Sequence, residues 1–221
     1  MPNWVFNTVS ASREVLESFI SEDDNGESIV DFNRIIQMPG VFEGITIGSY
    51  IDEDGNSHER WREKVVDGKS IIFPLSKDEI EELLQRFGVD NWYDWSLQNW
   101  GCKWNASDSD FGLNDGFLQF NTPWSPPDHF YLALSAKFPN ENINVFWEEE
   151  TGFGRQFTIR NGSIYESYEW DSPDCEDLDE FGTYAEKYKG HPDRPNNRWI
   201  IEGDDSITFS NLVEVRDHLK S

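Results

Sequence analysis

The order of the predicted strands and helices is the feature that most constrains the fold of this chain. A strand is predicted at residues 4–10, which are mostly apolar and β-branched. A helix follows, because Val15, Leu16 and Phe19 fall on one face at helical spacing. A second strand is predicted at residues 28–33. The chain therefore opens as a β–α–β unit.

The same order returns later in the chain. A strand is predicted around Leu118, Phe120 and Thr122, which alternate and so make its inner face. A helix is predicted within residues 125–139, which begin with Ser and two prolines and end at a proline. Another strand is predicted at residues 143–150. A split pair of βαβ units predicts an α+β protein with a ferredoxin-like core, in which an antiparallel sheet carries two helices on one face.

A large insertion, residues 34–114, separates the two units. Residues 34–68 are rich in Gly and Asp and are predicted to be irregular, apart from a hairpin turn at residues 52–56. A short helix is predicted through residues 92–100, and residues 108–116 are predicted to be a polar turn region.

Two local signals are stronger than the others. A helix is predicted from Ser76 to Gly88, with Ser76 as N-cap, Glu79 at the capping-box position and Gly88 as the stop. Asn161 and Gly162 predict a tight hairpin between two strands, added after the second unit. We therefore expect a ferredoxin-like domain at residues 1–170, with residues 171–221 as an acidic extension packed on it.

Aromatic residues are expected to fill the core. Hydrophobic residues make up 37% of the chain, but aromatic residues alone make up 15%, and ten of them are Trp. Each aromatic side chain buries about 150–250 Å², so few are needed. A disordered acidic chain would contain few of them.

The charge of the chain limits its partners. Asp and Glu number 43 against 18 Lys and Arg, giving a formal net charge of −25. This balance disfavours nucleic acids and anionic membranes and favours a basic partner. With two cysteines and neither a signal peptide nor a membrane-length apolar run, the sequence predicts a soluble, cytoplasmic protein.

Six short motifs occur in an order that matches a known family. They are MPNW at the start, DFNRIIQMP from Asp31, NWGCKWNA from Asn99, FNTPWSPP from Phe120, ALSAKFP from Ala133 and EEETGFG from Glu148. Together they resemble the YubB-like and Api-like ferredoxin-domain proteins of phages and plasmids, over about residues 1–170. Cys102 stands where the family usually has a small residue or Thr. The resemblance implies the fold and a mobile-element origin. The family has no agreed catalytic residue, so none is carried over.

The NWGCKWNA motif, here called the Trp box, can be interpreted in two ways. As a structural plug, it would bury Trp100 and Trp104, with turns shaped by Gly101 and Asn105. Alternatively, an exposed aromatic platform beside Lys103 would bind a nucleotide or another small ligand by stacking. The structural interpretation is favoured, and Trp124 of FNTPWSPP is grouped with the box as a family residue.

Acidic runs are the other candidate surface. They are either a solvated surface or a presented anionic face that imitates DNA phosphates. The predicted partner-binding residues are Glu166, Glu169, Asp171, Asp174, Glu176, Asp177, Asp179 and Glu180.

No cofactor, metal or catalytic residue is predicted, because no ligand spacing or catalytic motif stands out. The leading hypothesis is a non-enzymatic mobile-element accessory protein. It would bind a basic host protein through its acidic surface, as a counter-defence inhibitor or DNA mimic. The alternatives are a small-ligand or nucleotide-binding module using the Trp box, or an enzyme of unrecognised type. The oligomeric state is left open.

Overall fold

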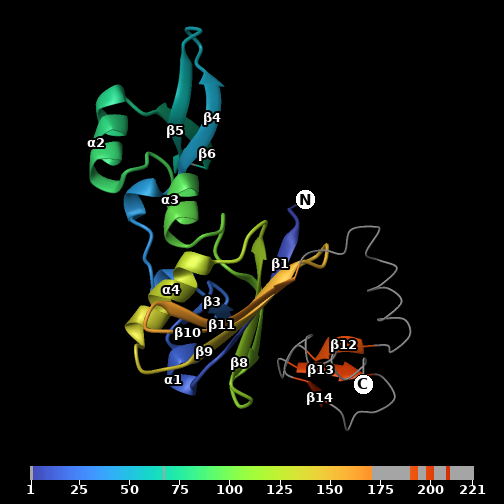
Figure 1. Ribbon diagram of the computed structural model, residues 1–221. Coiled ribbons are helices and arrows are strands. Elements are labelled where there is room, and N and C mark those ends of the chain that lie inside the picture. Colours follow the sequence, from blue (N-terminus) through green and yellow to red (C-terminus); the bar gives the residue numbers. More distant parts are fainter. Residues whose placement is uncertain (1, 67, 171–189, 194–197, 202–207, 210–221) are drawn as a thin grey trace.

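One antiparallel sheet of six strands organises the structure, a computed structural model that describes residues 2–66, 68–170, 190–193, 198–201 and 208–209 (Figure 1). Its order is β11-β10-β9-β1-β8-β7. The strands are β1 (Trp4–Ser10), β7 (Ser107–Gly112), β8 (Phe117–Pro123), β9 (Ile143–Glu149), β10 (Gly154–Arg160) and β11 (Ser163–Trp170). The predicted α+β class with an antiparallel sheet is confirmed.

Helices α1 (Arg13–Glu17) and α4 (Asp128–Lys137) lie on the same side of this sheet (Figure 1). Phe19, just after α1, meets Phe130 of α4 edge-on, with ring centroids 5.4 Å apart. The connection from β8 through α4 to β9 follows the prediction for this part of the chain.

The hairpin from β10 to β11 also follows the prediction. Asn161 and Gly162 have positive φ angles of 47° and 70°, as a two-residue type I′ turn requires.

Two strands are placed differently from the prediction. The strand expected at residues 28–33 is β3 (Ser28–Val30), and it pairs with β2 (Ile20–Glu22) in a separate two-stranded sheet. The predicted helix ends early, at Glu17, because the chain turns into β2. The place beside β8 is taken by β7, where a polar turn was predicted. As an edge strand with partly exposed side chains, β7 carries little hydrophobic signal.

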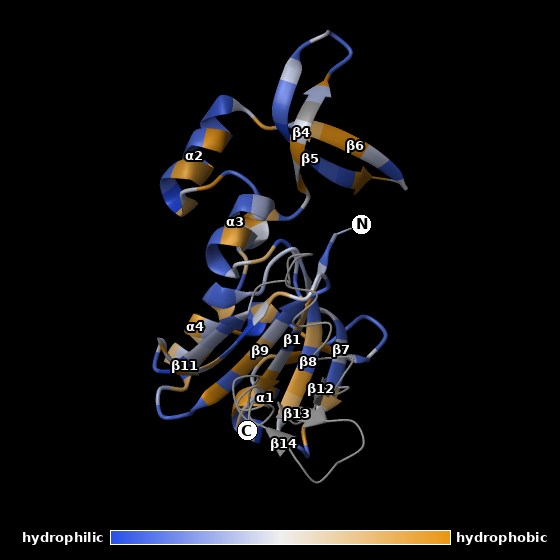
Figure 2. Ribbon diagram, turned by 45° about the vertical axis from the view of Figure 1, so that its right-hand side comes forward, coloured by the Kyte–Doolittle hydropathy of each residue, from blue (hydrophilic) through white to orange (hydrophobic). Residues whose placement is uncertain are grey.

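Part of the chain between β3 and β7 forms a second lobe (Figures 1 and 2). The range predicted as an insertion, residues 34–114, also contains β7 of the main sheet. The lobe holds the 3₁₀ turn η2 (Gly40–Phe42), the sheet β4-β5-β6 (Ile45–Ile51, Ser57–Val66, Lys69–Pro74), and helices α2 (Lys77–Phe87) and α3 (Trp92–Asn99). The 3₁₀ turn η1 (Phe32–Arg34) precedes the lobe and packs against the main sheet and α4.

The prediction that residues 34–68 are irregular is wrong, since they contain β4 and β5. Side chains of β5 are exposed or only half-buried, so its sequence lacks a clear apolar alternation. The hairpin turn at residues 52–56 is confirmed. The helix after Ser76 is also confirmed, with both hydrogen bonds of the capping box present and Gly88 in the left-handed region.

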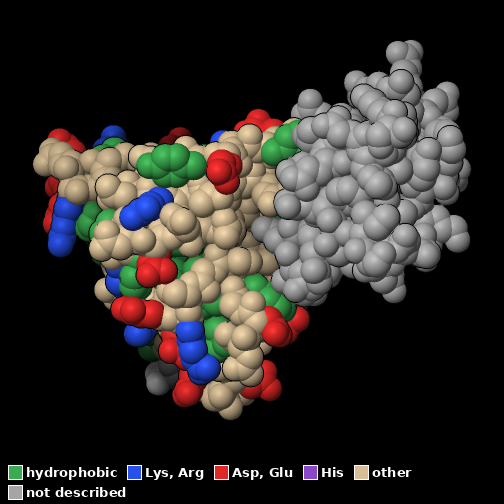
Figure 3. Space-filling model, turned by 60° about the horizontal axis from the view of Figure 1, so that its bottom comes forward, with side chains coloured by type: hydrophobic (Ala, Val, Ile, Leu, Met, Phe, Trp, Pro, Cys, Tyr) green, Lys and Arg blue, Asp and Glu red, His purple; other side chains and the backbone are tan. Residues whose placement is uncertain are grey.

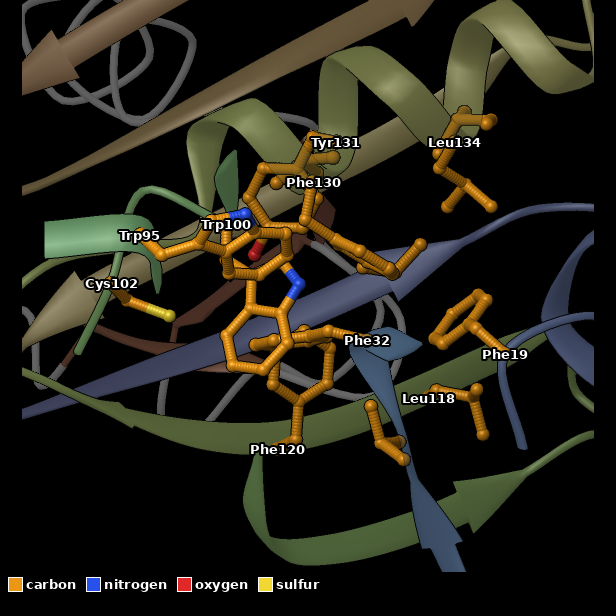
Figure 4. Packing of buried hydrophobic residues seen from close by; sticks show 14 of the residues in the cluster. Phe19, Phe32, Trp95, Trp100, Cys102, Leu118, Phe120, Phe130, Tyr131 and Leu134 are labelled. Carbon is orange, nitrogen blue, oxygen red and sulfur yellow. The ribbon is translucent and has the colours of Figure 1, made fainter. Parts of the chain in front are cut away.

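Aromatic side chains fill the core between the helices and the main sheet (Figure 4). Phe32 lies at its centre, with ring centroids 5.8 Å from Trp100, 5.6 Å from Phe120 and 4.5 Å from Phe130. The predicted inner face of β8 is confirmed, because Leu118, Phe120 and Thr122 are all buried.

The side-chain amide of Asn7 is buried in this core, and its nitrogen and oxygen both have hydrogen-bond partners. The side-chain nitrogen of Asn7 donates to Thr122 Oγ1 at 3.0 Å and to the carbonyl of Val5 at 2.9 Å. The hydroxyl of Tyr131 donates to Asn7 Oδ1 at 2.8 Å. These bonds satisfy a buried amide that would otherwise oppose folding.

The remaining described residues, in the C-terminal part of the chain, form one more small sheet. Strands β12 (Gly190–Asp193), β13 (Arg198–Ile201) and β14 (Thr208–Phe209) form a small antiparallel sheet. The division of the chain at residue 170 stays a prediction. No helix in the described part of the chain is long and apolar enough to span a membrane.

The Asn7 network predicts the effect of removing one hydroxyl. Tyr131→Phe leaves Asn7 Oδ1 buried without its donor, so the free energy of unfolding should fall by about 1–3 kcal/mol. Urea denaturation measures this. As a control, Tyr165→Phe removes the same group from a side chain that is 52% exposed, and should change stability by less than about 0.5 kcal/mol. Equal stability of the two variants would show that the Asn7 amide does not depend on Tyr131.

Candidate functional site

The Trp box lies where α3, α4 and the main sheet meet. Trp100 is the C-cap of α3 and is 4% exposed, which confirms its predicted burial. Its indole nitrogen donates to the carbonyl of Ile36 at 2.9 Å, and its ring meets Trp95 edge-on at 5.5 Å. Trp100 is therefore a structural residue that joins the segment around Ile36 to the core.

Gly101 lies against the first turn of α4. Its φ is +93°, and a Cβ built there would come within 2.9 Å of the backbone nitrogen of Asp128. Ser125 Oγ donates to the Gly101 carbonyl at 2.8 Å, and the amide of Phe130 donates to the Trp100 carbonyl at 3.1 Å. Both the φ angle and the close contact require glycine.

Asn105 joins the box to the DFNRIIQMP motif. Its side-chain nitrogen donates to Asp31 Oδ1 at 2.7 Å, while its side-chain oxygen accepts the backbone amide of Phe32 at 2.8 Å. Three motifs that are distant in the sequence, beginning at Asp31, Asn99 and Phe120, thus meet at one place.

Trp104 is not buried, so the prediction for this residue is wrong. It is 40% exposed and packs against Trp124, which is 49% exposed. The two ring centroids are 5.8 Å apart and the planes are tilted by 40°. The buried position of this turn is taken instead by Cys102, whose thiol donates to the Trp104 carbonyl at 3.2 Å.

Lys103 and Tyr93 complete an aromatic platform, defined here as Tyr93, Trp104 and Trp124 with Lys103. The Lys103 ammonium lies 4.5 Å from the ring centroid of Trp104, 4.6 Å from that of Trp124 and 5.6 Å from that of Tyr93. All three distances are within the range of a cation–π interaction. Tyr93 comes from α3 and was not anticipated as a site residue, because only the folded chain brings it to the box.

The backbone at Trp124 is held in an unfavourable conformation. Its φ is +63°, and the amide of Ser125 donates to the Pro123 carbonyl at 2.8 Å, which makes a γ-turn centred on Trp124. The amide of Trp124 donates to the Asn3 carbonyl at 2.8 Å. A non-glycine residue held this way costs on the order of 1–3 kcal/mol, and such residues cluster at functional sites. Here the strained turn holds a large aromatic side chain in solvent.

The predicted acidic face is described only in part. Glu166 and Glu169 are exposed on β11, and Glu169 pairs with Arg155 at 2.9 Å. The other predicted residues lie outside the described residues: Asp171, Asp174, Glu176, Asp177, Asp179 and Glu180. On the face in Figure 3, acidic side chains lie among Lys, Arg and hydrophobic side chains.

Two buried titratable groups belong to the box or lie next to it. Burial is the main cause that raises the pKa of the Asp128 carboxyl, and Arg155 opposes it. Burial also raises the pKa of the Cys102 thiol to about 12. A thiol with so high a pKa is inert as a nucleophile at neutral pH. Within the described ranges, no three His, Cys, Asp or Glu side chains gather to hold a metal ion.

Gly101 allows a stability test with a matched control. Gly101→Ala introduces both a strained φ and the 2.9 Å contact, whereas Gly88→Ala introduces only the strain, because no atom lies within 4 Å of the built Cβ. We expect Gly88→Ala to cost about 1–2 kcal/mol, and Gly101→Ala to cost about 1–3 kcal/mol more. Urea denaturation compares them. Equal losses would mean that the contact with α4 carries no energy.

The raised pKa of Asp128 predicts how the stability of the protein depends on pH. The folded state holds this proton to higher pH than the unfolded state. The stability that Asp128 contributes is therefore full below its ordinary pKa and is lost as pH rises through its raised pKa. Asp128→Asn should gain stability relative to the wild type as pH rises from 4 to 7. Urea denaturation across that range measures the difference, and a difference that does not change with pH would contradict the prediction.

Comparison with known proteins places the Trp box within a domain that a family model matches. Residues 99–186 match the family model for the ferredoxin-like domain in Api92-like protein. No curated protein matches the chain. Among solved structures, the crystal structure of protein Api92 from Yersinia pseudotuberculosis is similar at 13% identity, over 77% of this chain and 99% of that chain, with a TM-score of 0.40. The predicted ferredoxin-like domain is confirmed at residues 99–170, and the match continues to residue 186, beyond the end that the sequence predicted. Over the matched residues the chain is similar to Api-like proteins.

Proposed function

We propose that this chain is a non-enzymatic binding protein whose aromatic platform is its contact with a basic partner protein. The observation that carries the proposal is the exposure of Trp104 and Trp124 side by side, with Trp124 held on a strained turn. Trp and Tyr are enriched among the residues that dominate binding energy at protein interfaces, because their large rigid rings lose little entropy on binding.

Net charge supports a basic partner. At −25, the chain attracts cationic surfaces over long range, and such attraction raises association rates more than affinity. Within this proposal the acidic residues around and beyond Glu166 and Glu169 steer the partner, while the platform supplies the contact that holds it.

The biological setting is also a proposal. The order of the motifs and the match at residues 99–186 support an Api-like accessory protein of a phage or plasmid, acting in the host cytoplasm. Its core is β1, α1, β7, β8, α4 and β9, with the second lobe as an insertion. A nucleic-acid-handling host enzyme has the basic surface that this proposal needs, and inhibition of such an enzyme would be a counter-defence activity. Mimicry of DNA needs a regular row of carboxylates, so a steering role is preferred for the acidic residues.

Binding of a hexa-arginine peptide tests the platform, because substitution of Trp leaves the net charge unchanged. Trp104→Ala and Trp124→Ala should each weaken binding roughly tenfold, since cation–π contacts are lost. Fluorescence anisotropy of a labelled peptide at 50 and 500 mM NaCl measures the affinity. Tyr165→Ala removes an exposed aromatic side chain of β11 and should leave binding unchanged.

Wild-type affinity in both Trp variants would exclude the platform as the contact. Binding would then depend on charge alone, and neutralisation of Glu166, Glu169 and the following acids would abolish it.

A second candidate, a small-ligand module, is favoured by the position of Lys103, whose charge suits a phosphate. Titration with AMP and simple sugars, followed by tryptophan fluorescence, addresses it, and a flat response would count against it.

A further inference from the structure

The aromatic platform already holds a cation from its own chain. The Lys103 ammonium lies within 4.5–5.6 Å of three ring centroids that come from α3, the Trp box and the turn after β8. The ring planes of Trp104 and Trp124 make an angle of 40°, and the ammonium lies at nearly equal distances from the two ring centroids. This arrangement is a cage for a positive charge, because the faces of aromatic rings carry negative electrostatic potential.

The described structure gives the ammonium no other anchor. In the parts of the chain that the structure describes, no carboxylate lies within ion-pair distance of Lys103 Nζ. The side chain is half-buried, and both indole rings are exposed. A lysine stem has four rotatable bonds, so the ammonium can leave the cage without any movement of the backbone.

We infer that the platform is a receptor for a cationic side chain of the partner, an arginine guanidinium or an alkylated ammonium, and that Lys103 is an internal competitor for the same place. The inference rests on the proposed binding function and adds the chemical class of the group that is bound. The partner's cation enters as Lys103 swings out to solvent. The net charge of −25 favours a cation over an anion at long range, and quaternary ammonium groups are bound in aromatic cages in this way.

Removal of Lys103 distinguishes competition with a cation from binding of an anionic ligand, because the two roles predict opposite changes in affinity. If the lysine presented its charge to an anionic ligand stacked on the indoles, as a nucleotide would require, its loss would weaken binding. If it competes with an incoming cation, its loss strengthens binding. The sign of the change therefore separates the two roles.

The test uses tetramethylammonium chloride as the cationic probe and AMP as the anionic one, with the full chain. Binding is followed by NMR through the indole N–H signals of Trp104 and Trp124, against NaCl at matched ionic strength. Lys103→Ala should bind tetramethylammonium roughly five- to tenfold more tightly than the wild type. Lys103→Ala combined with Trp124→Ala should lose that gain. Lys137→Ala removes the same charge from a lysine that faces a single ring, Phe138, at 5.9 Å, and should bind as the wild type does.

Other results overturn the inference. An unchanged or weaker affinity in Lys103→Ala shows that Lys103 does not compete for the cage, as does an equal gain in Lys137→Ala, which would be an effect of net charge. AMP binding that is lost in Lys103→Ala assigns the lysine to an anionic ligand. Lys103→Met, which keeps the length of the side chain, replaces the Ala variant if that variant does not fold. A failure of this inference leaves the hexa-arginine result intact, whereas wild-type peptide binding by both Trp variants removes the proposed function itself.

Discussion

The close approach of the Trp100–Gly101 turn to the first turn of α4 is the contact on which the rest of the structure depends. Gly101 brings two backbones together at a distance that no side chain permits. The amide of Phe130, at the start of α4, then bonds the Trp100 carbonyl. This contact carries the indole of Trp100 into the aromatic core, where it meets Phe32. The second lobe is thereby joined to the main sheet through buried aromatic packing as well as through the chain.

The same contact decides which side chains of the Trp box face solvent. With Trp100 turned into the core, Cys102 takes the next buried position and Trp104 is left outside. The turn after β8 brings Trp124 to it, at the cost of a positive φ. One short motif thus has two roles: Trp100 is buried in the core, and Trp104 forms part of an exposed aromatic surface.

Charge and aromatic surface are complementary in this protein. The −25 charge acts at long range and attracts cations, but it is diffuse and screened by salt. The aromatic cage acts only in contact and selects a group of the right size and charge. The Lys103 ammonium packs against both exposed indoles, and in the inferred binding reaction the partner's cation replaces it. In this view, the affinity for the partner depends on how much more strongly its cation binds to the rings than the Lys103 ammonium does.

The sequence by itself determined the features that depend on residues close together in the chain. These include the capping box at Ser76, the turn at Asn161 and Gly162, the inner face of β8 and the aromatic character of the core. Tertiary structure alone decided which strand lies beside β8, because β7 carries little hydrophobic signal and β3, although predicted as a strand, pairs with β2 instead. It also decided that Trp100 is buried and Trp104 exposed, since the two are alike in sequence and differ only in what the fold packs against them. The sequence raised an exposed platform beside Lys103 as one alternative. It could not show that Tyr93 and Trp124 complete the cage, because they come together with Lys103 only when α3, the box and β8 dock on α4.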